Sequence, residues 1–509
     1  MEKTPEKSLD ADSSKLIRGV SWNALGNVST LVFTLLLSIY LARVLGSHGY
    51  GIWSLLTSLL GVIVVLFNFG FDATLNRYVP ELRHRGLETT IRPLIKKMAL
   101  AKMGAVLVLA PILLVGKDEV SRIIFKDSLV TDTIPLLAIV LYLFVIDGVV
   151  RATLASFYQQ KFLNLAEVVL RITTIIAVVA LLQWKLEVFS VLLGFAIGQA
   201  IFLLACLAKI YSILPASVSK EHTLPLRSFA LSMYLFAILA YVLGPQLDIL
   251  MLGLFSIGPE EIALYCIGFY LAYTVLSLFP MLMAGGITLT FVSELHTKDK
   301  KKQLRQTHSM MLEYMFFFNI PITIGGIIVG SEIIGLLYPP EFGGAYLIFS
   351  IYLVFLTFLK LGGITSTFLA AMNHQTNLLK ARTLGGCLNI FLNIVLIPKW
   401  GLLGAVVATG SSGIIALVWE FLMVHRLIKP KYPLVFLLKT GIAGSIMGIM
   451  VWVLATFLNV AVIISVPCAG LFYFALQFFM HPFSQETKQL LSQAGSPFSK
   501  FFHNSKTQP

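Results

Sequence analysis

Almost the whole chain consists of apolar stretches long enough to cross a lipid bilayer. A membrane-spanning helix needs about 20 apolar residues, and the 509 residues are 57% hydrophobic and only 12% charged. A water-soluble protein carries about 25% charged residues. We therefore predict an all-α polytopic membrane protein without a soluble domain. The expected transmembrane helices number about fourteen and cover residues 17–45, 49–71, 98–116, 133–152, 162–183, 187–211, 226–255, 260–292, 309–337, 344–372, 376–397, 401–427, 434–457 and 460–481.

The first six expected helices are repeated by the next six. Residues 80–82 match 293–295, and residues 158–164 match 371–377, so that both landmarks indicate a spacing of 213 positions. Parallel repeats of six-helix units are typical of transporters, which bind their substrate between the two halves. The expected organisation is a tail at 1–16, an N-lobe at 17–211, a C-lobe at 226–427, two further helices at 434–481 and a tail at 482–509.

Lys and Arg residues gather in the N-terminal tail and in alternate loops. These loops lie near residues 77–97, 298–305 and 426–431, within a chain of formal net charge +13. Loops rich in Lys and Arg stay on the cytoplasmic side of a membrane. We therefore expect a multi-pass protein of the cell membrane with both termini in the cytoplasm. The same placement argues against nucleic acid as a partner.

Motifs that would mark an enzyme or a cofactor site are missing from the sequence. It has no P-loop, no H-E-x-x-H, no G-x-S-x-G and no cluster of metal ligands. The four cysteines lie far apart within apolar stretches, which argues against disulfides and metal binding. We expect no catalytic residue, no cofactor and no bound metal centre. Energy for transport would come from an ion gradient, the membrane potential or the substrate gradient.

Ionisable residues deep in the expected helices are the candidate functional residues, because each costs about 2.5–3.5 kcal/mol at the bilayer centre. Lys360 lies near the middle of the tenth helix and has no acidic neighbour within one turn. Arg171 is similarly deep in the fifth helix, one turn after Glu167. Asp147 and Arg151 are spaced i, i+4, which places them on one face of the fourth helix.

Basic and acidic residues of this set have different expected roles. The basic side chains are predicted to line a cationic cavity for an anionic substrate, such as a phosphate or diphosphate, and they are Lys360, Arg171 and Arg151. The acidic side chains are predicted to bind a coupling H⁺ or Na⁺ or to pair with the bases, and they are Asp248, Asp72, Asp147 and Glu167. The alternative for Glu167–Arg171 and Asp147–Arg151 is a purely structural role as ion pairs. Lys102, Glu313 and Glu420 are expected nearer the membrane surfaces.

Three segments resemble motifs of oligosaccharide flippases. Residues 42–51 (ARVLGSHGYG) are similar to the turn after the first helix of these proteins, and residues 74–81 (TLNRYVPE) to the end of the second. Residues 388–409 (LNIFLNIVLIPKWGLLGAVVAT) resemble the hairpin between helices eleven and twelve. On these motifs, residues 15–480 resemble the polysaccharide-export branch of the multidrug/oligosaccharidyl-lipid/polysaccharide exporter superfamily.

The resemblance implies two six-helix lobes with two further helices. It also implies carriage of a polyprenyl-diphosphate-linked oligosaccharide from the cytoplasmic to the outer leaflet by alternating access, for surface polysaccharide biosynthesis. Membrane lipids and other membrane proteins of polysaccharide assembly are the partners that such a role suggests. The alternatives are a multidrug or cation antiporter, for which the deep charges are too basic, and a flippase for a peptidoglycan lipid precursor. A membrane enzyme of glycan assembly would need a large external loop, which this sequence lacks.

Overall fold

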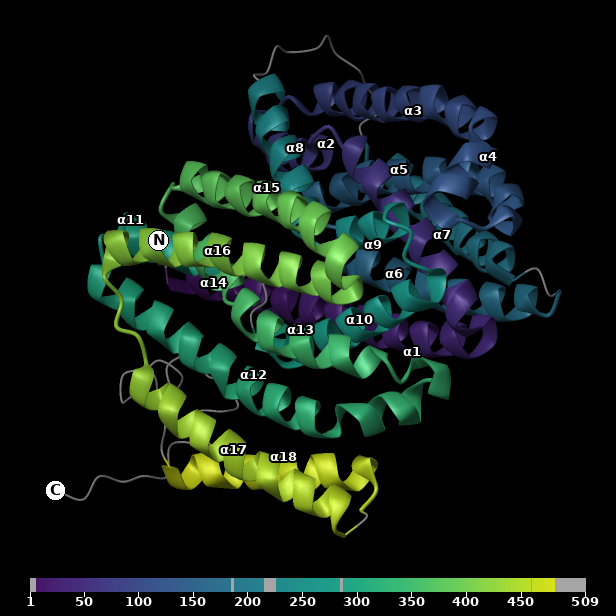
Figure 1. Ribbon diagram of the computed structural model, residues 1–509. Helices are drawn as coiled ribbons and strands as arrows, with labels where there is room; N and C mark the ends of the chain where they lie inside the picture. Colours follow the sequence, from purple (N-terminus) through teal and green to yellow (C-terminus); the bar gives the residue numbers. More distant parts are fainter. Residues whose placement is uncertain (1–5, 185–186, 215–225, 284–286, 459, 481–509) are drawn as a thin grey trace. The chain divides into compact units, whose positions relative to one another are not determined.

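The computed structural model describes residues 6–184, 187–214, 226–283, 287–458 and 460–480, and these residues are almost entirely helical (Figure 1). Among them, twelve helices are long and apolar enough to cross a membrane, or thirteen if the bent pair α8 (Leu226–Val242) and α9 (Pro245–Leu254) forms one span. The expected all-α membrane architecture is therefore confirmed. The count is below fourteen because the first two expected helices form one element, α1 (Glu6–Leu66).

Gly46 divides α1 into two helical arms. Its φ of 67° and ψ of −177° are outside the helical region, and a positive φ is accessible to glycine at no steric cost. Gly51, five residues later in the same motif, touches the backbone of Pro259, since a Cβ at Gly51 would lie 1.8 Å from the Pro259 carbonyl oxygen. The glycines of the 42–51 segment thus serve a break in the helix and a close backbone contact.

Packing divides the chain into two compact units. The first unit takes in the described residues of Met1–Cys266 together with Asn389–Thr409. Within it, α5 packs on α2, α3 and α7, and α6 packs on α7 (Figure 1). Besides α1, α8 and α9, its elements are α2 (Phe71–His84), η1 (Glu88–Thr90), α3 (Ile91–Val115), α4 (Lys117–Val120), η2 (Ser121–Phe125), η3 (Ser128–Thr133), α5 (Ile134–Ser156), α6 (Gln160–Leu182) and α7 (Glu187–Ile213).

The second unit takes in Ile267–Leu388 and the described residues from Gly410 onward. This division follows packing, whereas the expected lobes follow the sequence repeat; α8, α9 and residues 389–409 pack with the first unit. The remaining elements, some of which cross the boundary between units, are α10 (Pro259–Met283), α11 (Ile287–Thr297), α12 (Lys301–Leu337), η4 (Pro340–Phe342), α13 (Ala345–Leu359), α14 (Gly362–Ala371), α15 (Gln375–Trp400), α16 (Leu402–Ile428), α17 (Leu434–Thr456) and α18 (Val462–Met480).

The two helices outside the repeat, α17 and α18, lie side by side and pack against α12 (Figure 1). Pro321 within α12 has no N–H group, so the carbonyl of Phe317 loses its usual helical donor. The Tyr473 hydroxyl of α18 donates to this carbonyl at 2.7 Å. On α17, Gly444 and Gly448 allow close approach to isoleucines of α12. The glycines of α17 therefore serve packing within this chain.

The positions of equivalent turns agree with the predicted repeat spacing at one landmark and differ from it at the other. Gly86 and Asp299, which follow α2 and α11, both have positive φ and are 213 positions apart. The equivalent turns after α5 and α14 have positive φ at Tyr158 and Asn373, 215 positions apart. The match of 158–164 with 371–377 is therefore wrong by two residues. The second copy is longer between the two turns, and it is interrupted between α13 and α14 where α5 is continuous.

Candidate functional site

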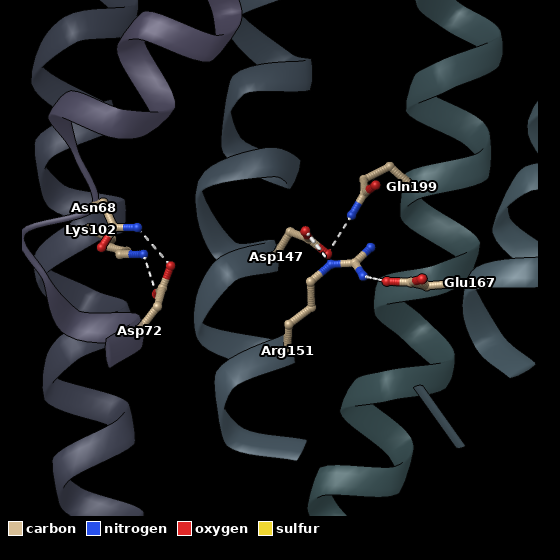
Figure 2. Close-up of polar contacts among 7 residues, drawn as sticks. All are labelled: Asn68, Asp72, Lys102, Asp147, Arg151, Glu167 and Gln199. Carbon is tan, nitrogen blue, oxygen red and sulfur yellow. Dashed lines mark hydrogen bonds and ion pairs between the residues drawn. The ribbon is translucent and has the colours of Figure 1, made fainter. Parts of the chain in front are cut away.

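Three helices of the first unit hold a partly buried network around Arg151. Its Nε donates to Asp147 Oδ2 at 2.6 Å, and its Nη1 pairs with Glu167 of α6. Gln199 of α7 donates from Nε2 to Asp147 Oδ1 at 2.9 Å (Figure 2). The predicted facing of Asp147 and Arg151 is confirmed. Arg151 is thus held between two carboxylates, which makes it a structural cation in this arrangement.

Arg171 stands one turn beyond Glu167 on α6, but Glu167 is directed to Arg151. The Nε atom of Arg171 is buried and has no hydrogen-bond partner among the described residues. The expected pairing of Glu167 with Arg171 is therefore replaced by a pairing between α5 and α6. This leaves the guanidinium of Arg171 with unused hydrogen-bonding capacity.

Asp72 is neutralised by a lysine from another helix. Lys102 of α3 donates from Nζ to Asp72 Oδ1 at 2.7 Å, and Asn68 donates from Nδ2 to Asp72 Oδ2 at 2.8 Å (Figure 2). The Lys102 side chain is only 3% exposed and that of Asp72 is 25% exposed. The side chain of Lys102 is thus enclosed by protein, where it is the counter-charge of Asp72. An ion pair that is largely buried holds α2 and α3 together.

Asp248 is fully buried in the first unit and is surrounded by neutral donors. Its carboxylate accepts hydrogen bonds from Tyr265 Oη at 2.6 Å, Asn393 Nδ2 at 2.7 Å and Thr409 Oγ1 at 2.5 Å. Asn389 completes the network by donating to Thr409 Oγ1 at 2.6 Å. Among the described residues, no Lys or Arg pairs with Asp248. The motif 388–409 therefore supplies three of the residues that hold this carboxylate.

Two features suit the Asp248 network to a small cation or a proton. An ionised carboxylate is costly in a buried site without a positive partner. In addition, the side-chain carbonyl Oδ1 of Asn393 is buried and accepts no hydrogen bond in the described part of the chain. Carboxylate, amide and hydroxyl oxygens are the ligands that hard cations prefer.

Lys360 of the second unit contacts neutral groups of α10. Its Nζ donates to Ser277 Oγ at 2.6 Å and lies 3.4 Å from the centroid of the Tyr273 ring. A cation over an aromatic face gains about 0.5–2 kcal/mol, but neither contact cancels its charge. No acidic side chain in the described ranges forms an ion pair with Lys360. The residue occupies the end of α13, where that helix is interrupted before α14.

The second unit also contains a buried ion pair that the sequence analysis did not identify. Glu420 of α16 is almost fully buried within the protein. It accepts hydrogen bonds from Arg382 Nε at 2.9 Å and from Thr365 Oγ1 at 2.5 Å. Arg382 therefore neutralises Glu420, as Lys102 neutralises Asp72.

The charged residues thus fall into two groups. Most are compensated by an opposite charge, and these are Asp72, Asp147, Arg151 and Glu167, with their partner Lys102. Three predicted site residues form no ion pair in the described part of the chain, and these are Asp248 and Arg171, in the first unit, and Lys360, in the second. Sequence reasoning missed Lys102, Gln199, Tyr265, Thr409 and Arg382 as partners. Of these, Thr409 alone carried a signal, as the last residue of the 388–409 motif.

The amino-acid sequence of the chain is similar to that of a known protein family. The family model described as polysaccharide biosynthesis protein matches residues 16–270. The chain is 23% identical over 499 residues to the lipid II flippase MurJ of Bacillus subtilis, covering 88% of this chain and 90% of the relative. It is 27% identical over 290 residues to the probable flippase AglR of Haloferax volcanii, covering 53% of this chain and 59% of the relative.

Solved structures show the same fold. The lipid II flippase MurJ in an inward closed conformation superposes with a TM-score of 0.68 at 18% identity, over 90% of this chain and 98% of that one. An inward-facing multidrug resistance MATE family transporter gives a TM-score of 0.62 at 14% identity, over 79% and 96%. With half of its length matched by the family model, the chain belongs to the polysaccharide biosynthesis protein family of the multidrug/oligosaccharidyl-lipid/polysaccharide exporter superfamily, whose members are membrane transporters and not enzymes.

Proposed function

We propose that this transporter is a flippase that moves a polyprenyl-diphosphate-linked oligosaccharide from the cytoplasmic to the outer leaflet by alternating access. A glycan head group is too polar to cross hydrocarbon unaided, whereas a prenyl chain is apolar and stays in the lipid. Family membership and the similarity to two proteins named as flippases support this substrate class. In this role the chain serves surface polysaccharide biosynthesis.

The observation that carries the proposal is the uncompensated charge of Lys360. A positive charge within a membrane-spanning helix is costly. Such residues therefore pair with an opposite charge or mark the path of a substrate or ion. Its contacts, Ser277 and the Tyr273 ring, leave the ammonium group net positive. A diphosphate supplies the missing negative charge, and charge-assisted hydrogen bonds to phosphate oxygens are among the strongest available to a protein. Arg171, with its unused Nε, is proposed as a second anion-binding group.

The contacts of Arg151 support a structural role for it in place of the predicted role in substrate binding. Arg151 already pairs with Asp147 and Glu167. We therefore propose that it shapes the first unit without contacting the diphosphate.

Asp248 is proposed as the residue that couples transport to an ion gradient. Its oxygens, together with the free Oδ1 of Asn393, suit a proton or Na⁺. Binding and release of the cation would change the net charge of a buried site and thereby favour one conformation over another.

A multidrug or cation antiporter is less consistent with these charges. Such a transporter needs free acidic groups for a cationic substrate. In the first unit, Asp72 is neutralised by Lys102, and Asp147 and Glu167 share Arg151. Of the acidic residues predicted for the site, Asp248 alone has no basic partner among the described residues. A flippase for a peptidoglycan lipid precursor uses the same diphosphate chemistry and differs only in the sugar and peptide it carries.

The deciding experiment is deletion of the gene in its native host, followed by extraction and mass spectrometry of lipid-linked glycans. We expect a complete oligosaccharide repeat to accumulate on its carrier and to be inaccessible to enzymes added outside. Accumulation of a peptidoglycan precursor would identify that cargo instead. Normal surface glycan together with altered drug or dye tolerance would contradict the proposal and favour the antiporter.

A further inference from the structure

An apolar groove of about 390 Å³ lies between α16 and the junction of α13 and α14. Phe358 and Leu361 line one side, and Leu417, Val418 and Leu422 line the other. Phe358, Val418 and Leu422 are about half exposed within membrane-spanning helices, so the groove faces the hydrocarbon of the bilayer. Its width and apolar lining suit a hydrocarbon chain, and its volume is within the range of ligand pockets.

Along α16 the groove ends at two side chains that carry polar groups. His425 and Tyr432 line it there, with their rings stacked at an interplanar angle of 15° and Tyr432 Oη 3.5 Å from His425 Nδ1. Tyr432 lies between α16 and α17, and partial burial raises the pKa of its hydroxyl above the ordinary value of 10. The hydroxyl is therefore protonated at neutral pH and can donate a hydrogen bond to an anionic oxygen.

The segment at this polar end is positively charged and fixed in place. Arg426, Lys429 and Lys431 are exposed and have no acidic partner among the described residues. Arg305 Nε donates to the Ile428 carbonyl at 2.5 Å, and Ser309 Oγ donates to the Lys431 carbonyl at 2.8 Å, so the backbone is anchored to α12. A hydrocarbon groove that ends in an anchored basic segment has the two parts of a binding site for an acidic lipid.

We propose that this groove binds an acidic phospholipid of the leaflet at that end, with one acyl chain along α16 and the phosphate near His425, Tyr432 and Lys431. The site is separate from the proposed substrate group, because Lys360, on the same turn as Phe358 and Leu361, contacts α10 while these two residues line the groove beside α16. The lipid would fix α16 to the start of α17, and so link the repeat to its two additional helices.

The test measures which lipid stays with the purified full-length protein. The protein is exchanged into mixed micelles that contain equal amounts of dioleoyl phosphatidylglycerol and dioleoyl phosphatidylcholine, and lipid retained after gel filtration is measured by mass spectrometry. We expect a preference for phosphatidylglycerol of at least about fivefold, the effect of a single basic residue near an anionic lipid. In the double variant Arg426→Gln/Lys431→Gln the preference should disappear. Val418→Trp, which fills the groove from an exposed position, should lower retention of both lipids.

Arg92→Gln/Lys96→Gln is the matched control, since it removes two exposed charges from the start of α3 in the first unit and should leave the preference intact. Thermal unfolding of each variant checks that it is folded. Equal retention of the two lipids by the unmodified protein, or an equal loss in the control variant, would overturn the proposal. So would complete displacement of phosphatidylglycerol by an equal amount of undecaprenyl phosphate, which would assign the groove to the lipid carrier.

Discussion

Lys360 places a positive charge beside neutral partners, and its removal is the most direct test at the scale of one residue. Lys360→Met keeps the length of the side chain and removes the charge that we assign to the diphosphate. A charge-assisted hydrogen bond contributes about 1.5–3 kcal/mol, so transport should fall about ten- to hundredfold. The measurement is export of the lipid-linked glycan in a deletion strain, at equal expression.

Lys360→Arg is the matched control for this change. It retains the charge and the donors, and it should retain a large part of the activity. If Lys360→Met exports glycan at the normal rate, Lys360 has no part in substrate binding.

Asp248 gives a second prediction at this scale. Asp248→Asn preserves the shape of the side chain and most of its hydrogen bonds but removes the charge that a proton or Na⁺ would balance. We expect glycan export to become independent of the ion gradient and to be slow, with little loss of stability. Transport into proteoliposomes, measured with and without an imposed Na⁺ or H⁺ gradient, reports this dependence. An unchanged response to both gradients would remove Asp248 from the coupling step.

Asp72 and Lys102 illustrate a charge pair whose role is structural. Lys102→Met leaves Asp72 without its counter-charge in a largely buried position. Loss of one partner from a buried ion pair costs about 3–5 kcal/mol, and we expect the lower end because Asp72 is one-quarter exposed. The double variant Asp72→Asn/Lys102→Met should recover most of this loss. Thermal unfolding in detergent measures both, and equal stability of the single and double variants would contradict the pairing.

At the scale of elements, a glycine of α17 allows that helix to pack closely on α12. A Cβ at Gly448 would lie 2.7 Å from Ile324 Cγ2 and 2.9 Å from Ile328 Cδ1, whereas nothing lies within 4 Å of a Cβ at Gly441. Gly448→Leu should therefore destabilise the protein by about 1–3 kcal/mol through overpacking. Gly441→Leu, on the same helix, should be neutral or slightly stabilising. A similar loss from both variants, measured by thermal unfolding, would mean that packing on α12 is not the cause.

The helices and their order along the chain were largely predictable, whereas the partners of the charged residues were not. Apolar stretches about 20 residues long indicate helices in lipid regardless of what they contact, and so the helices were found with small errors at their ends. Arg151 pairs with Asp147 at i, i+4, a spacing that sequence shows directly. Its second partner, Glu167, lies on another helix, as does Lys102 relative to Asp72. Such pairs depend on helix packing, which a single sequence does not specify.

At the scale of the whole molecule, we predict the orientation in the membrane from loop charge. With both termini in the cytoplasm, a cysteine at Lys302 should react only with reagents that reach the inside of the cell, and a cysteine at Lys117 should react with an impermeant maleimide added outside. The four natural cysteines are first replaced by serine or alanine in a variant that retains function. Labelling of both positions from the same side would contradict fourteen crossings with this orientation.

The hydrogen bond from Tyr473 to the Phe317 carbonyl has a consequence for anyone who shortens this protein. Because Pro321 leaves that carbonyl without a helical donor, a chain that stops after α16 would lose the hydrogen bond that Tyr473 donates to it, and such a loss is costly in hydrocarbon. The last two helices are therefore not a detachable appendage. A minimal version of the transporter would first need a residue with a backbone amide in place of Pro321.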